Sequence, residues 1–224
     1  MIKSHPTAEL IREFVAGELS PALALAVSAH VDMCRLCQAQ VLAVEAELAG
    51  AALDDVVENN DAHVVMDAGL EGMLANILES EDVVVTQPSG VKYIELNGRK
   101  FRLPRALQTH AANASQWRQM GKLWRSRMHQ DESWRTSFLY IEQGGNIPQH
   151  THKGREATLV LSGSFVDEDD IYQEGDFILR DANHTHTPGA DASEDCLCFA
   201  AVEAPLHFTS GPSRLLNPLG KLLY

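Results

Sequence analysis

The sequence predicts a two-domain α + β chain, in which a small four-helix domain precedes a β-rich domain. Apolar residues recur at helical spacing as far as Ile77, which predicts amphipathic helices over the first third of the chain. A breaker, Pro88-Ser89-Gly90, then interrupts this pattern. Beyond it, short runs rich in β-branched and aromatic residues alternate with turn residues, which is typical of an all-β sandwich or barrel.

Length and composition agree with two domains. The 224 residues exceed a typical single domain, and we place the helical domain at residues 1–85, a linker at 86–92 and the β domain at 93–224. No window approaches the roughly 20 apolar residues of a membrane span. The first residues lack the charged and apolar regions of a signal peptide, so we expect a cytoplasmic protein that does not engage a membrane.

Four helices are expected in the first domain. Pro6 and Thr7 offer a helix start, and the first helix carries an apolar stripe. A second helix begins at Pro21 and a third runs from about Cys34 to Gly50, and the pattern leaves open whether these two are continuous. The fourth helix bears a face of methionine and leucine, which fits either a core or an adaptable partner interface. The stripe of the first helix comprises Leu10, Ile11, Phe14 and Val15, and the face of the fourth comprises Met66, Leu70, Met73, Leu74 and Ile77.

Short strands are expected to fill the second domain. The run from Tyr93 to Arg99 alternates in polarity and contains an Asn97-Gly98 dipeptide, which predicts a tight turn. Further strand candidates are residues 136–143, 157–161, 176–179 and 196–202. Residues 107–135 contain three tryptophans that supply bulk for a core, but their pattern predicts no element.

The net charge of −13 is concentrated near the N-terminus. Residues 1–90 hold fifteen acidic against three basic residues, whereas residues 91–224 hold sixteen against fifteen. A negative field of this size repels nucleic acid and attracts a basic protein surface, so we expect a protein partner and no direct binding of DNA or RNA. The alternative is that the acidity serves solubility alone.

A first metal site is predicted by the segment from His30 to Cys37, whose spacing is H-x3-C-x2-C. Residues three and four apart share one face of a helix, so His30, Cys34 and Cys37 can present one nitrogen and two sulfur atoms to a single ion. These ligand types favour tetrahedral zinc, and His5 would supply the fourth ligand. A structural zinc would stabilise a domain that has little core of its own. The alternative is two reduced core cysteines beside an unrelated histidine.

A second metal site is predicted around His150, His152 and Glu156. In a strand, side chains of one parity share a face, so all three can point inward. The fourth ligand would come from His184 or His186, about thirty residues further on. Three imidazoles and one carboxylate suit Zn, Fe, Mn, Ni or Cu, and ligand type alone does not choose among them.

The second site resembles that of the cupins, whose fold is a double-stranded β-helix barrel. The first cupin motif, G-x5-H-x-H-x3-E-x6-G, matches at every fixed position, from Gly144 to Gly163. The second motif, G-x5-P-x-G-x2-H-x3-N, fits from Gly175 and places its histidine at His186. Three residues depart from the second motif, namely Asp181, Asn183 and Ala190, which stand in place of Pro, Gly and Asn.

A cupin behind an H-x3-C-x2-C helical domain resembles the ChrR-type zinc anti-sigma factors over nearly the whole chain. The resemblance implies zinc at His5, His30, Cys34 and Cys37, and a cupin metal, for which we expect zinc, at His150, His152, Glu156 and His186. It also implies that the chain inhibits an extracytoplasmic-function (ECF) sigma factor, and so regulates transcription. Release of the sigma factor would follow oxidative stress from singlet oxygen or an organic peroxide.

Two questions remain open in the sequence. Cys196 and Cys198 share one face of an expected strand, so they are either redox participants or buried small hydrophobes. The main alternative function is a metal-dependent cupin dioxygenase with a helical regulatory domain. No further residue stands out as a positioned acid or base, so we expect a regulator and not an enzyme.

Overall fold

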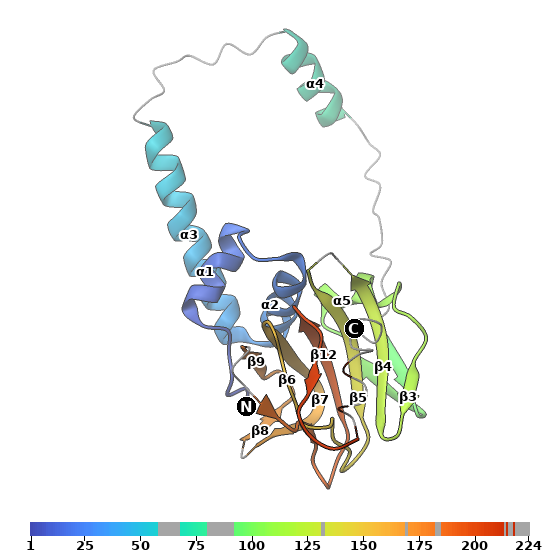
Figure 1. Cartoon of the computed structure of the whole chain (residues 1–224). Coiled ribbons are helices and arrows are strands. Elements are labelled where there is room, and N and C mark those ends of the chain that lie inside the picture. Colours follow the sequence, from blue (N-terminus) through green and yellow to red (C-terminus); the bar gives the residue numbers. More distant parts are fainter. Residues whose placement is uncertain are drawn as a thin grey trace.

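The structure, a computed structural model, describes residues 1–57, 68–79, 92–130, 133–168, 170–181, 185–212, 214 and 217. It confirms a two-domain α + β chain, with helices at the N-terminus and an antiparallel β-sheet domain at the C-terminus (Figure 1). The linker expected at 86–92 lies outside the described residues except for Lys92, and so does Met66.

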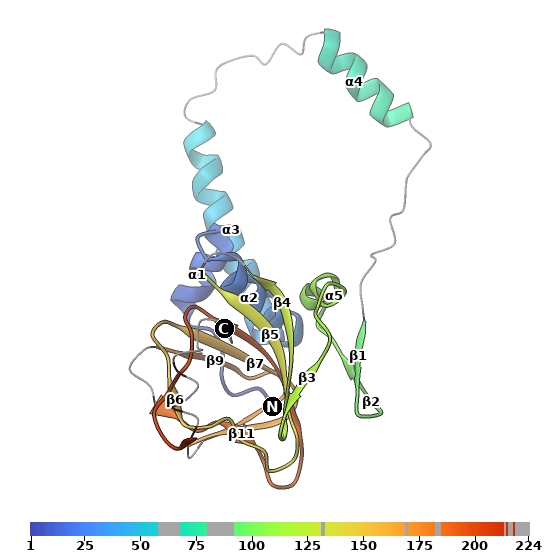
Figure 2. The same ribbon diagram turned by 45° about the vertical axis from the view of Figure 1, so that its right-hand side comes forward.

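Five helices occur in the described ranges, so the expected four-helix domain is not confirmed. They are α1 (Ala8–Ala16), α2 (Pro21–Met33), α3 (Arg35–Val57), α4 (Ala68–Glu79) and α5 (Arg105–Ala111). The fifth, α5, follows the first hairpin of the second domain and packs on α2, where Asp32 accepts a hydrogen bond from the Ala106 amide at 2.8 Å. In contrast, α4 stands apart in Figures 1 and 2, and its described side chains are exposed. The helices therefore do not form a separate four-helix bundle.

Local chemistry explains where the first helices begin and end. The Thr7 hydroxyl accepts from the Leu10 amide at 3.1 Å and caps α1, and Gly17 ends it with φ +74°. Pro21 occupies the first turn of α2, where its missing N–H costs nothing. Cys34 has extended backbone angles (φ −117°, ψ 107°), so α2 and α3 are separate helices.

Within the described residues, the strands form one large sheet and two small ones. The large sheet has the order β11-β7-β12-β5-β4-β3, with β8 and β9 also paired to β7, and the small sheets are β1-β2 and β10-β6-β13. Each pairing between the described strands is antiparallel. The bounds are β1 Tyr93–Leu96, β2 Arg99–Arg102, β3 Arg118–Met120, β4 Leu123–Gln130, β5 Arg135–Ile141, β6 His150–Thr151, β7 Glu156–Asp167, β8 Asp170–Gln173, β9 Phe177–Arg180, β10 Thr185–His186, β11 Gly189–Ala190, β12 Cys196–Val202 and β13 His207–Phe208.

The main hydrophobic core is shared by the helices and the sheet. One cluster joins Leu23 and Val27 of α2 to Leu159 of β7, Phe177 of β9 and Phe199 of β12, all nearly inaccessible to solvent. A second cluster lies within the sheet domain and includes Cys196 and Cys198. A third, small cluster joins α1 to α3 around Ile11, Cys34, Cys37 and Val41. The N-terminal helices are therefore bound to the sheet by burial of apolar surface.

One part of α3 differs from the expectation that no segment is long and apolar enough for a membrane span. By length and composition alone, Arg35–Leu53 meets that requirement, and a second candidate arises only if α1 and α2, bent by 114°, are counted as one span. Only 11% of the Arg35–Leu53 window is buried. The segment is thus an exposed, apolar helix of the described chain.

Candidate metal centres

The helical domain brings together the four residues expected to bind zinc. One ligand atom from each of His5, His30, Cys34 and Cys37 lies within 4.8 Å of every other. His30 lies in the last turn of α2, Cys34 stands at the break between the helices, and Cys37 lies in the first turn of α3, so the helix-helix corner gathers three of them. His5 comes from the extended N-terminal arm. Three of the candidate ligands are thus close in the sequence, whereas the fourth, His5, is brought to them by the tertiary fold.

The separations within this cluster fit a tetrahedral ion. The Nδ1 of His5 lies 3.5 Å from the Sγ of Cys34 and 3.5 Å from that of Cys37, and the Nε2 of His30 lies 3.2 Å from the Sγ of Cys37. Nitrogen and sulfur atoms bound to one tetrahedral zinc at about 2.0 and 2.3 Å lie about 3.5 Å apart. The donor set and its spacing therefore suit zinc.

Protonation in the helical cluster also suits a cation. Burial lowers the pKa of His30 to about 4, so its imidazole is neutral at pH 7. Its Nδ1 lies 2.8 Å from the Gly175 carbonyl, and donation there leaves the Nε2 lone pair facing Cys37. Burial, together with the hydrogen bond to Cys34, raises the pKa of Cys37 to about 12. A thiolate at Cys37 therefore needs a cation, and metal binding would release a proton.

The sheet domain brings together the four residues of the second predicted site. His150, His152, Glu156 and His186 offer atoms within 4.8 Å of one another. They do not share one strand as expected, because β6 ends after Thr151 and β7 begins at Glu156. His186 on β10 is the cross-strand partner of His150 on β6, which explains how they meet. His184 lies outside the described residues.

The donor atoms of this second cluster are closely spaced. Nε2 of His186 lies 3.0 Å from that of His152 and 3.1 Å from that of His150. Oε2 of Glu156 lies 2.8 Å from Nε2 of His152 and 3.8 Å from that of His186. Ligands at about 2.1 Å from one ion lie about 3.0 Å apart at right angles and about 3.4 Å apart in a tetrahedron. Three of the four separations lie near the right-angled value, so one divalent transition-metal ion could accept donor atoms from all four residues.

Neighbouring groups orient the second cluster. His186 Nδ1 lies 2.9 Å from Oδ1 of Asp167, and His150 Nδ1 lies 2.8 Å from the Pro148 carbonyl, so both rings turn Nε2 toward the cluster. Burial lowers the pKa of His150 to about 4. Burial acts to raise the pKa of Glu156, but the hydrogen bond from His152 and the adjacent imidazoles outweigh it, and the pKa lies below its usual value.

Asp167 is a supporting residue that the sequence did not reveal. Its side chain is 1% exposed, and it accepts from Arg180 at 3.2 Å as well as contacting His186. Burial raises its pKa, but the bond with His186 and the charge of Arg180 leave the net pKa below its ordinary value. It lies nineteen residues before His186, and no motif position marks it.

The structure explains why a glycine, Gly163, closes the first motif. Its φ is +77°, and a Cβ there would lie 1.8 Å from the Asp195 carbonyl oxygen. Only glycine lets β12 approach β7 so closely. The first motif thus contains metal-ligand candidates and, at Gly163, a residue required by the close approach of two backbone segments.

The second cysteine pair is buried. Cys196 and Cys198 are 0% and 1% exposed on β12, with Sγ atoms 3.3 Å apart. The hydrogen bond between them, together with burial, raises the pKa of Cys196 well above its usual value. Both side chains therefore belong to the core and are not exposed to solvent, although their proximity would allow one to react with the other.

Two family models match the chain. A ChrR cupin-like domain matches residues 106–204, and a zinc-finger family matches residues 7–38. These ranges contain seven of the eight candidate ligands, because His5 lies just before the zinc-finger match.

Two named proteins are similar over nearly the whole chain. The anti-sigma-E factor ChrR of Cereibacter sphaeroides is 30% identical over 225 residues, covering 99% of each chain. The crystal structure of Rhodobacter sphaeroides SigE in complex with the anti-sigma ChrR matches with a TM-score of 0.66 and 27% identity, over 90% of this chain and 100% of that chain. Both names describe a regulator, which confirms the expectation that the chain is not an enzyme. With this identity over its full length, the chain belongs to the ChrR-type anti-sigma factor family.

Proposed function

We propose that the chain binds and inhibits an ECF sigma factor in the cytoplasm, and that oxidative stress from singlet oxygen or an organic peroxide releases that partner. The observation that carries the proposal is the similarity, over 90% of this chain, to a ChrR solved in complex with SigE. Such a protein represses transcription by occupying its sigma factor and needs no contact with nucleic acid or membrane.

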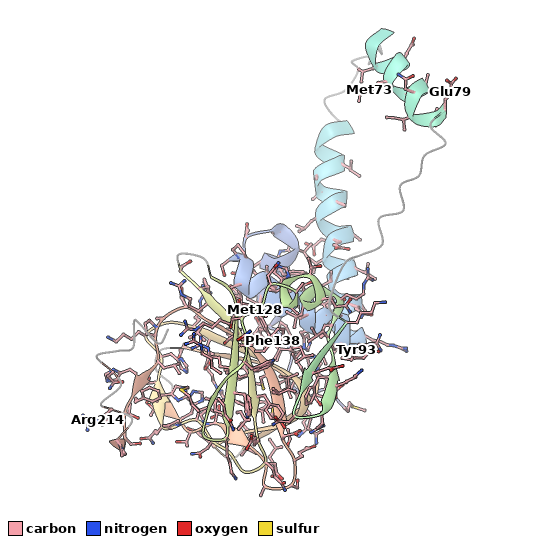
Figure 3. All side chains as sticks on the ribbon, turned by 90° about the vertical axis from the view of Figure 1, so that its right-hand side faces the viewer. Met73, Glu79, Tyr93, Met128, Phe138 and Arg214 are labelled. Atoms are coloured by element: carbon pink, nitrogen blue, oxygen red, sulfur yellow. The ribbon has the colours of Figure 1, made fainter. Side chains whose placement is uncertain are left out.

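An apolar surface on α3 and α4 supports this proposal. On α4, Leu70, Met73, Leu74 and Ile77 recur at helical spacing and are 45% to 62% exposed. Figure 3 shows Met73 on this helix, away from the sheet domain. On α3, Leu36, Leu42 and Leu53 are 57% to 65% exposed. Exposed apolar side chains gathered on two helices are typical of a binding surface.

Charge favours a basic partner for the same region. The first 90 residues carry fifteen acidic and three basic residues, so the apolar surface is set in a negative field. Sigma factors carry basic surfaces because they contact DNA and RNA polymerase. Complementary charge would speed association, while the apolar side chains would supply most of the affinity.

The two metal sites would have different roles, one structural and one sensory. Zinc at His5, His30, Cys34 and Cys37 would hold the α2–α3 corner from which the binding helices extend. A divalent metal, for which we propose zinc, at His150, His152, Glu156 and His186 would belong to a sensory cupin domain. The thiols of Cys196 and Cys198 are the candidate redox groups, because a sulfenic acid on one would lie against the other.

Inhibition is tested by co-expressing the chain with each ECF sigma factor of its own genome, and by purifying complexes through a tag on the chain. We expect one sigma factor to co-elute in a 1:1 complex and to lose activity in transcription with RNA polymerase. Absence of any co-eluting sigma factor, from a chain that is folded and metal-loaded, would refute the proposal.

The binding surface is tested with matched charge variants of α4. Met73→Asp places a carboxylate on the apolar face and should weaken sigma capture at least about fivefold, since a central apolar anchor contributes more than about 1 kcal/mol. Asn76→Asp adds the same charge off this face and should have little effect. Equal affinities of the two variants would exclude this face of α4 from the interface.

A further inference from the structure

The turn between β8 and β9 belongs to the sheet domain but contacts a ligand of the helical zinc cluster. The carbonyl of Gly175 lies 2.8 Å from Nδ1 of His30. This hydrogen bond selects the tautomer and fixes the ring so that Nε2 faces Cys37 at 3.2 Å. Partners of this kind orient metal ligands and raise their basicity. One ligand of the helical cluster is therefore oriented by the other domain.

The same turn holds the arm that carries His5. Asp176 is 0% exposed, and its Oδ1 accepts the amides of Lys3 at 2.6 Å and Ser4 at 2.9 Å. The Ser4 carbonyl accepts in return from the Phe177 amide at 3.0 Å. Because Ser4 precedes His5 directly, these three bonds set the place of the His5 side chain.

The turn is rigid and fits closely against the arm. The Gly175 amide donates a hydrogen bond to the carbonyl of Val160 on β7 at 2.8 Å, and the Asp176 carbonyl accepts one from the Val160 amide at 3.1 Å. Gly175 has φ +93°, and a Cβ there would lie 2.5 Å from Cδ1 of Ile2. The glycine that opens the second cupin motif thus makes room for the N-terminal arm.

We propose that Gly175 and Asp176 are positioning residues of the helical zinc site, so that the site is composite and its zinc affinity depends on the sheet domain. Zinc in turn ties the N-terminal arm and α2 to the start of β9. The proposal rests on the helical cluster holding zinc, as proposed above, but it goes further. It predicts that Asp176 of the cupin domain, 172 positions from Ser4 in the sequence, alters zinc binding.

The test uses cobalt as a spectroscopic probe in the full-length protein. Co²⁺ bound by Cys34 and Cys37 gives a thiolate-to-metal charge-transfer band, which the His and Glu ligands of the cupin site cannot produce. Competition between Co²⁺ and Zn²⁺ then yields the zinc affinity of the helical site. We expect Asp176→Asn to weaken zinc binding about tenfold and Asp176→Ala up to about 100-fold.

A matched control is Asp191→Asn. Asp191 also accepts from a backbone amide, that of Ser193 at 2.8 Å, but in an exposed turn of the sheet domain. Its substitution should leave the zinc affinity of the helical site unchanged. If Asp176→Ala does not fold, Asp176→Asn decides the question.

A double-mutant cycle separates positioning from general destabilisation. If Asp176 acts by placing the arm that carries His5, then Asp176→Asn should have little further effect on zinc affinity in a His5→Ala background. Additive losses in the cycle, or an Asp176→Asn affinity within twofold of wild type, would overturn the inference. Absence of a thiolate band in the wild-type protein would refute the zinc proposal itself.

Discussion

Substitution of Leu23 by alanine should destabilise the sheet domain together with the helices. Leu23 of α2 is 1% exposed and lies in the cluster that includes Leu159, Phe177 and Trp134. A leucine-to-alanine change at a fully buried site removes apolar contacts and leaves a cavity, at a cost of about 2 to 5 kcal/mol. With a urea dependence of about 1 to 3 kcal/mol per M, a loss of about 3 kcal/mol lowers the unfolding midpoint by about 1 to 3 M.

The three tryptophans make this prediction easy to measure. All of them, Trp117, Trp124 and Trp134, belong to the second domain, so tryptophan fluorescence reports the sheet while circular dichroism reports the helices. For Leu23→Ala we expect both transitions of the zinc-loaded protein to move together. Leu53→Ala, at a site on α3 that is 63% exposed, should move neither by more than about 0.5 kcal/mol. A fluorescence transition that stayed in place would refute the shared core.

Three further predictions concern the metal sites. Cys34→Ser should remove one zinc per chain and abolish sigma capture, as measured by metal analysis and co-purification. Glu156→Gln should leave sigma capture intact but blunt release by oxidant, as measured by transcription in vitro before and after treatment with an organic peroxide. In metal-free protein, the pKa values of about 4 for His30 and His150 lie below the ordinary value of about 6.5. The unfolded chain therefore binds more protons in that window, and lowering the pH from 7 to 5 should cost about 2 kcal/mol per histidine in urea titrations.

The ligand sets could be predicted because their spacing is local. His30, Cys34 and Cys37 lie within eight residues, so helix geometry alone brings them near one another. The first cupin motif similarly places His150 and Glu156 at the two sides of one short connection. In both clusters, most of the candidate metal ligands are therefore recognisable from a short stretch of sequence.

The supporting residues could not be predicted because their contacts are long-range. Asp167 meets His186 across nineteen residues, and Asp176 meets the Ser4 amide across 172. Neither contact leaves a periodic or motif signal, and a lone aspartate in a strand-rich segment reads as a turn residue. Only the fold shows that both carboxylates are buried.

The ends of one strand and one helix differ from the prediction. The strand expected at 157–161 is part of β7, which continues through Gly163 to Asp167, and its pairing with β12 is irregular between Leu197 and Cys198. The helix expected to end at Gly50 continues to Val57. The sequence predicts no element at α5, β3 or β4. In β3 and β4, arginines interrupt the alternation of polarity that is typical of a strand.

The strand β9 joins the surroundings of the two metal clusters. At its start, Phe177 and the preceding turn bind the arm of His5 and the ring of His30. At its end, Arg180 donates to Asp167, which orients His186 of the cupin cluster. Continuity of contacts becomes coupling only where a shared element has two arrangements that both sites bias. Among the described elements β9 contacts the surroundings of both clusters, so a second arrangement of this strand would be needed to couple the proposed cupin sensor to the proposed zinc site.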